Sequence, residues 1–228
     1  MTISSDNGCD LVKPMKIIGQ SCISLVMLFT MLSLSLAGCG PKGDPRENRR
    51  AEFIGCMKRE DYGCIVRLTS KEERDAIGFT DETKAQQFIR DAFHQLQVQT
   101  KADPSVETVG VGSFPVHYPY RTPASPNGRL SFFIDETDEG PVARGLYFIL
   151  VLMLATEEGL RGGYASNGPD RHIARAKFFR EQGAELNRKY GMKGYYDLTS
   201  MSLKTWEELA AESDVRASRA QQPANSPR

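Results

Sequence analysis

The segment 142–155 is the most apolar stretch of the chain after its N-terminal region. Its core, residues 146–155, is too short to cross a bilayer, which takes about 20 helical residues. Tyr147, Ile149 and Val151 favour a strand, and apolar side chains occupy both faces of that strand. A sheet face open to water alternates apolar with polar residues. We therefore expect a strand over 142–155 that other elements cover on both faces.

The N-terminal part of the domain, from residue 44 onward, is predicted to be helical. Asp44 can cap a helix in which Pro45 occupies the first turn and Glu47 the third position after the cap. A helix over about 45–59 is therefore expected, followed by a short helix over about 62–69.

Two further helices follow. Ser70 and Glu73 have the spacing of a capping box, which predicts a short helix that ends at Gly78. After Thr80, expected as its cap, apolar residues recur at spacings of three and four, which predicts a longer amphipathic helix. The residues of this apolar stripe are Ala85, Phe88, Ile89, Ala92, Phe93 and Leu96.

After the amphipathic helix, the residue pattern over 106–166 favours strands and turns. Valines and glycines over 106–114 indicate a strand, and the prolines of 115–126 predict a loop. A strand is expected over 129–135, before an acidic turn over 135–140. After 142–155, a turn at Glu157–Gly159 leads to a last strand over 160–166.

The C-terminal part is again helical. A helix capped by Asp170 is expected over 170–190, and a short helix over 203–211. Residues 213–228 are polar and poor in apolar side chains, which predicts disorder. The fold class is therefore α+β: N-terminal helices packed on a curved antiparallel sheet, with a C-terminal helical appendage over 169–212.

The N-terminus has the pattern of a secretory signal. Lys13 and Lys16 precede an apolar run over 17–36, and small residues close it. Translation from Met15 would give a more usual signal length. The alternative is an uncleaved membrane anchor.

The sequence Leu36-Ala37-Gly38-Cys39 resembles the lipobox of bacterial lipoproteins. The resemblance implies that residues 1–38 are removed and that Cys39 receives acyl chains that hold the protein in a membrane of the cell envelope. Gly40, where family sorting rules place Asp for inner-membrane retention, favours the outer membrane, with the domain in the periplasm or at the cell surface. Residues 39–44 form a tether.

Residues 53–62 (FIGCMKREDY), followed by Leu68-Thr69-Ser70, resemble bacterial lipoproteins of the nuclear transport factor two-like superfamily. The resemblance implies a cystatin-like cone over 45–168, in which helices and a bent sheet enclose a pocket. The appendage, residues 169–212, departs from the minimal family pattern. We expect the appendage, or a second copy of the chain, to cover the outer face of the sheet.

Removal of the signal leaves Cys39, Cys56 and Cys64. If Cys39 carries lipid, the other two can form a disulfide in an oxidising compartment. Eight residues of continuous helix would separate them by about 12 Å, so a bridge requires a chain reversal, for which the Asp61–Gly63 stretch is suited. Two buried free thiols are the alternative.

The three histidines are isolated from one another and from cysteines. His117 lies among Tyr118, Tyr120 and prolines, a cluster that could line a pocket; a loop packed by its own aromatic side chains is the alternative. His94 is expected beside the apolar stripe of the helix that follows Thr80, and His172 in solvent. We find no catalytic motif, no metal-ligand spacing and no cofactor fingerprint.

Formal charge is balanced, with 29 basic and 29 acidic residues, which gives no indication of nucleic-acid binding. Basic residues are concentrated on the helix expected over 170–190. Contact with anionic lipid headgroups or an acidic partner is one interpretation, and an ordinary solvated helix face is the other. The residues concerned are Arg171, Arg175, Lys177 and Arg180.

The sequence thus favours a membrane-anchored envelope lipoprotein whose domain binds a ligand, a partner protein or a second copy of itself rather than catalysing a reaction. The alternative is an isomerase or hydrolase that uses the cone pocket and His117.

Overall fold

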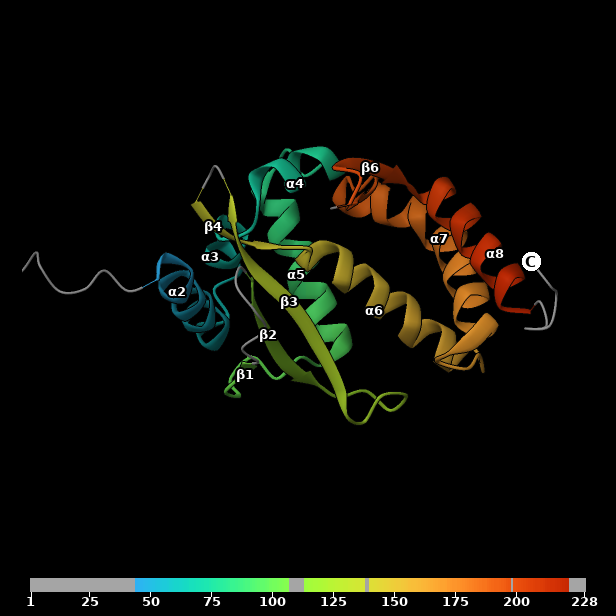
Figure 1. Cartoon of the computed structure of the whole chain (residues 1–228), viewed down its shortest axis with the longest axis horizontal. Helices are drawn as coiled ribbons and strands as arrows, with labels where there is room; N and C mark the ends of the chain where they lie inside the picture. Colours follow the sequence, from blue (N-terminus) through green and yellow to red (C-terminus); the bar gives the residue numbers. More distant parts are fainter. Residues whose placement is uncertain (1–43, 107–112, 138–139, 198, 222–228) are drawn as a thin grey trace, which may run out of the picture. The chain divides into compact units, whose positions relative to one another are not determined.

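The computed structural model describes residues 44–106, 113–137, 140–197 and 199–221. In these ranges it contains seven helices, a four-stranded antiparallel sheet in the order β1-β2-β3-β4, and a two-stranded antiparallel sheet formed by β5 and β6 (Figure 1). The predicted α+β class, with N-terminal helices packed on an antiparallel sheet and helices at the C-terminal end, is therefore confirmed.

The first two helices begin at the residues expected from the sequence. α2 (Pro45–Arg59) follows Asp44, whose carboxylate accepts a hydrogen bond from the backbone N–H of Arg46. Glu60 ends α2 in a left-handed conformation. Asp61 then caps α3 (Tyr62–Arg67) by accepting from the backbone N–H of Cys64.

The next two helices also agree with the sequence pattern. α4 (Lys71–Ile77) is capped by Ser70 and ends at Gly78, which has a φ of 100°. α5 (Glu82–Leu96) is capped by Asp81 and not by Thr80, because the Asp81 carboxylate reaches the backbone N–H of Thr83. Its six predicted apolar residues are all buried.

The four-stranded sheet is a meander of β1 (Ser105–Val106), β2 (Ser113–Tyr120), β3 (Gly128–Thr137) and β4 (Gly140–Arg144). Its inner face is fully buried and faces the helices, where the ring of Phe53 from α2 lies 4.6 Å from that of Phe132. The buried residues of this face are Val116, Tyr118, Tyr120, Leu130, Phe132 and Ile134.

The prediction of a loop over 115–126 was wrong for 115–120, which form most of β2. The prolines are tolerated because the edge of β2 opposite β3 is sparsely paired: β1 pairs only with Val116 and His117. The carbonyl of Pro119 accepts from the backbone N–H of Gln99. Of the strand predicted over 106–114, residues 107–112 lie outside the described residues.

The predicted strand over 142–155 was wrong beyond Arg144. Residues 140–144 form β4, but α6 (Leu146–Arg161) begins two residues later. The predicted turn at Glu157–Gly159 and the start of the predicted strand over 160–166 lie in this helix, and no strand follows it within 162–166. β-branched and aromatic residues favour strands only weakly, and an uninterrupted apolar run of this length suits a buried helix better.

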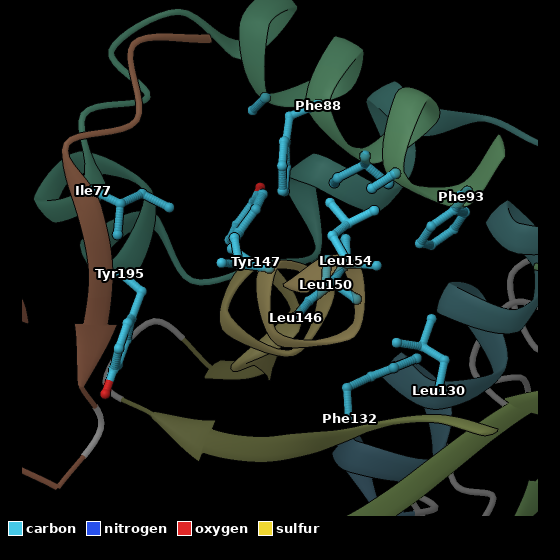
Figure 2. Close-up of a cluster of buried hydrophobic side chains, with 14 of the residues drawn as sticks. Ile77, Phe88, Phe93, Leu130, Phe132, Leu146, Tyr147, Leu150, Leu154 and Tyr195 are labelled. Atoms are coloured by element: carbon cyan, nitrogen blue, oxygen red, sulfur yellow. The ribbon is translucent and has the colours of Figure 1, made fainter. Parts of the chain in front are cut away.

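α6 is enclosed by other elements. Figure 2 shows its side chains between those of α5 and those of β3. A helix that is apolar all round has to be buried. We expected other elements to cover this segment on both faces of a strand; they cover it on more than one side, but as a helix. The α6 residues labelled there are Leu146, Tyr147, Leu150 and Leu154, each at most 5% exposed.

The C-terminal helix α7 (Gly168–Tyr190) packs against α6 and matches the helix predicted over 170–190. It begins after Asn167 and not at Asp170. α7 therefore covers the helix α6. We had expected the appendage, residues 169–212, to cover the outer face of the sheet. β5 (Gly194–Asp197) and β6 (Ser202–Thr205) follow α7 as a hairpin.

The prediction of disorder over 213–228 was wrong for 213–221, because α8 (Trp206–Gln221) includes them. The buried face of α8 carries only small side chains after Leu209, namely those of Ala210, Ser213 and Ala217. The helix can therefore lie close to α7. A low content of large apolar residues therefore did not indicate disorder here. Residues 222–228 lie outside the described residues.

The C-terminal elements share one core with the N-terminal helices. Asp91 of α5 accepts hydrogen bonds from Lys189 and Tyr190 of α7, and the backbone N–H of Lys193 donates to the carbonyl of Ile77. The described residues contain no helix long and apolar enough to cross a membrane.

A buried carboxylate lies where α4 meets the start of α6. Glu73 does not complete the capping box at Ser70; its Oε2 instead accepts from the backbone N–H of Gly145, the residue that precedes α6. Its Oε1 is buried without a hydrogen-bond partner among the described residues. Burial raises the pKa of Glu73 from 4.5 to about 7, although the Gly145 N–H and the nearby Arg144 and Arg74 act in the opposite direction.

We predict that the stability of the protein falls as pH rises from 4.5 through 7, because the native state holds the Glu73 proton more tightly than the unfolded state does. The pKa difference corresponds to about 3 kcal/mol. Replacement Glu73→Gln should remove this dependence and make the variant more stable than the wild type above pH 7. Urea unfolding across this pH range measures both effects.

The matched control is Glu181→Gln, the same change at an exposed position of α7. Carboxylates whose pKa is lowered, such as Asp197 with a pKa of about 2, make stability depend on pH only where the pH is below their ordinary pKa values, outside the range of this experiment. Identical pH profiles for wild type and Glu73→Gln would contradict the assignment.

Candidate anion-binding site

Positive charge is concentrated where α7 and α8 run antiparallel (Figure 1). Arg171 and Arg175 are one turn apart on α7 and so share a face, with His172 beside them. Arg216 of α8 acts electrostatically on both His172 and Arg175. We call Arg171, His172, Arg175 and Arg216 the arginine cluster.

A small cavity of about 90 Å³ lies at this cluster. His172, Arg175 and Arg216 line it, together with polar groups of Tyr195, Glu212 and Ser213. Its other walls are apolar and come from α6, α7 and α8: Phe148, Leu152, Phe179 and Leu209. The ring of Phe148 also packs on that of Tyr195, 4.3 Å away, so the apolar wall is held by β5 as well.

Burial and the neighbouring positive charges lower the pKa values of two members of the cluster, Arg175 and His172. Burial, then Arg171 and Arg216, lowers the pKa of Arg175 to about 10. The pKa of His172 is also lowered, by burial first and then by Arg171, Arg175 and Arg216. The Nε atoms of Arg171 and Arg175 are buried without a hydrogen-bond partner among the described residues. Buried charge of one sign without a counterion is unfavourable.

Two acidic residues of α8, Asp214 and the cavity-lining Glu212, form ion pairs with basic residues outside the cluster. Asp214 pairs with Arg180, and Glu212 pairs with Lys204 at 2.5 Å. Lys204 also pairs with Asp197. Within the described ranges, no carboxylate forms an ion pair with Arg171, Arg175 or Arg216. The cluster therefore has unbalanced positive charge beside a cavity.

The four basic residues that the sequence suggested for an anionic contact are separated by the structure. Arg171 and Arg175 belong to the cluster, Lys177 is exposed on another part of α7, and Arg180 is paired with Asp214. Sequence reasoning missed Arg216, which lies in the segment expected to be disordered. It also placed His172 in solvent, whereas the side chain is half-buried.

The suggested pocket residues are also separated. His117 and Tyr120 line an open pocket of about 350 Å³ beside Asp103 and Arg129. The Nδ1 of His117 lies 2.6 Å from the hydroxyl of Ser131 on β3. Tyr118 shares the inner face of the sheet with Tyr120 but does not line this pocket; it is fully buried, and burial raises its pKa.

The inner sheet face, where the resemblance to the nuclear transport factor two-like superfamily implies a pocket, is occupied by buried side chains such as Phe53, Tyr118 and Phe132. A further buried carboxylate, Glu157 of α6, accepts hydrogen bonds from Thr122 and Tyr120. Glu157 thereby attaches the loop after β2 to the helix.

Cys56 and Cys64 are paired in the structure as a disulfide, with Cα atoms 5.8 Å apart. The chain reverses between them where Glu60 ends α2 and Asp61 caps α3. Cys39, by contrast, lies outside the described residues.

We predict that loss of the disulfide lowers the free energy of unfolding by about 2 kcal/mol, because the bond restricts the unfolded chain over a sequence separation of 8. The double replacement Cys56→Ala/Cys64→Ala should unfold at lower urea concentration than the wild type and be insensitive to reductant. Reduction should bring the wild type to a similar stability. A wild type that reductant leaves unchanged would mean that the thiols are free.

Within the described parts of the chain, no group of three or more His, Cys, Asp or Glu side chains could hold a metal ion. No protein-family model matches the sequence, and no curated protein matches it significantly.

Proposed function

We propose that the chain is a lipoprotein of the bacterial cell envelope, anchored through Cys39, whose domain binds an anionic ligand or partner without catalysing a reaction. The arginine cluster is the observation that carries the binding role. Its charges are partly buried beside a cavity and lack acidic partners among the described residues, which is unfavourable unless an anion is bound.

The anchoring part of the proposal is supported by the motif Leu36-Ala37-Gly38-Cys39 and by the position of the domain along the chain. The described structure begins at Asp44, which caps α2, so residues 40–43 alone separate Cys39 from the domain. A tether of this length keeps the domain near the bilayer surface. Gly40 after the cysteine favours the outer membrane, with the domain in the periplasm or at the cell surface.

The family relation of residues 45–168 stays a proposal as well. Helices packed against one face of an antiparallel sheet support membership of the nuclear transport factor two-like superfamily. α6 stands where the resemblance led us to expect a strand, which counts against membership.

We predict that the wild type incorporates labelled palmitate and fractionates with membranes, and that globomycin causes its unprocessed form to accumulate. Replacement Cys39→Ser should abolish acylation, because it removes the thiol that would receive the diacylglyceryl group. The matched control is Cys22→Ser, the same change within the apolar run, which should leave acylation intact. Membrane association and processing that persist unchanged in Cys39→Ser would refute the anchor.

The pocket at His117 supports a second candidate function, a hydrolase or isomerase. It brings together an imidazole held by Ser131, a carboxylate of Asp103 and a guanidinium of Arg129. Asp103 is also paired with Lys58 and its side chain is 88% exposed, so it is poorly suited to hold the imidazole as a catalytic orienting group.

We predict that the purified protein hydrolyses p-nitrophenyl acetate no faster than its His117→Gln variant, because the proposed role is binding. Absorbance of released nitrophenolate measures the rate. His94→Gln, which changes an exposed histidine, is the control. A rate that depends on His117 and not on His94 would favour the enzyme.

A further inference from the structure

We propose that the arginine cluster is a binding site for one phosphate group, which occupies the cavity between α7 and α8 and contacts Arg175, Arg216 and His172. Phosphate binding rests on the proposed binding role of the domain but not on acylation of Cys39.

The charge of the cluster favours a phosphate over a carboxylate. Arg171, Arg175 and Arg216 carry three positive charges, and none of them forms an ion pair with a carboxylate among the described residues. The buried Nε atoms of Arg171 and Arg175 have no hydrogen-bond partner there either. A phosphate monoester carries up to two negative charges and offers several acceptor oxygens. Guanidinium groups bind such oxygens with two parallel hydrogen bonds, which lysine cannot do.

The dimensions of the cavity limit the ligand to a small group. Cavities that enclose drug-sized ligands measure about 300–1,000 Å³, whereas this one measures about 90 Å³. A single phosphate group therefore fits inside, and any larger part of the ligand remains outside. The apolar side chains of Phe148, Leu152 and Phe179 keep the local dielectric low, which strengthens the attraction between the arginines and an anion.

His172 makes the affinity depend on pH. Its pKa is lowered by burial and by Arg171, Arg175 and Arg216, and the other ionisable groups at the cavity are Glu212 and Tyr195. A bound anion offsets the repulsion from the arginines and so favours protonation of His172. Binding of sulfate, whose own charge is constant, should tighten as pH falls below 6.5, the ordinary pKa of histidine. His172→Gln should remove this dependence.

The test uses purified Cys39→Ser protein, which has no acyl chain, titrated with inorganic phosphate in a calorimeter. We predict saturable binding that weakens at least about tenfold in Arg175→Gln and in Arg216→Gln, because each removes a charged hydrogen-bond donor. Lys177→Gln is the matched control: it removes one positive charge from an exposed position of the same helix and should bind phosphate as the parent does.

Thermal unfolding gives a second measurement. Phosphate should raise the melting temperature of the parent and of Lys177→Gln but not that of Arg175→Gln. Without phosphate, Arg175→Gln should melt no lower than the parent, since it removes a partly buried charge that has no partner. Arg216 is exposed, so Arg216→Gln provides a variant that keeps the fold if Arg175→Gln fails to fold.

Vesicles distinguish a soluble phosphate from a lipid headgroup. Phosphatidylcholine vesicles with and without phosphatidic acid are sedimented with the Cys39→Ser protein. Binding that requires phosphatidic acid and Arg175 would assign the site to a lipid phosphomonoester. Calorimetric binding without vesicle binding would assign it to a soluble phosphate.

Absence of binding in both the calorimetric titration and the vesicle sedimentation would overturn the phosphate site. Binding that Arg175→Gln, Arg216→Gln and Lys177→Gln all weaken equally would also overturn it, because that result indicates general attraction to the basic face of α7. Neither result would affect acylation of Cys39, which is measured separately.

Discussion

The burial of α6 is the constraint on which the rest of the structure depends. This helix is apolar on all sides, so no single neighbouring layer could cover it. α5 and the inner face of the sheet cover one part, and α7 covers another. The C-terminal elements are therefore required by the core, and the cavity between α7 and α8 lies against the α6 side chains Phe148 and Leu152.

The same burial places ionisable groups in surroundings of low dielectric around α6. Glu73 is held at its N-terminal end by the backbone N–H of Gly145, and Glu157 lies in its last turns. Arg175 is partly buried where α7 crosses it. Low dielectric surroundings make unpaired charge costly, so each of these groups needs a partner, a proton or a ligand. Glu73 can avoid its buried charge by binding a proton. For the arginine cluster, we infer that a bound ligand balances the charge.

The proposed lipid anchor and the proposed anion site are compatible with the short stretch of sequence between Cys39 and α2. A domain attached to a bilayer samples a high local concentration of headgroups, so even a weak phosphate site would be occupied if lipids carry the group it binds. If the ligand is soluble, the proposed anchor would instead restrict where it is bound. Both uses need the same contacts with Arg175 and Arg216, and neither needs a catalytic residue.

The sequence by itself determined the local elements. Asp44, Asp61 and Ser70 set the starts of three helices, and the stripe from Ala85 to Leu96 identified α5 correctly, because caps and helical periodicity are short-range properties. The tertiary structure decided that 146–161 is a helix, since an apolar run has no periodicity that separates a strand from a buried helix and only its length favours the helix. It alone also brought Arg216 to Arg171 and Arg175, because that proximity results from the packing of two helices and leaves no spacing pattern in the chain.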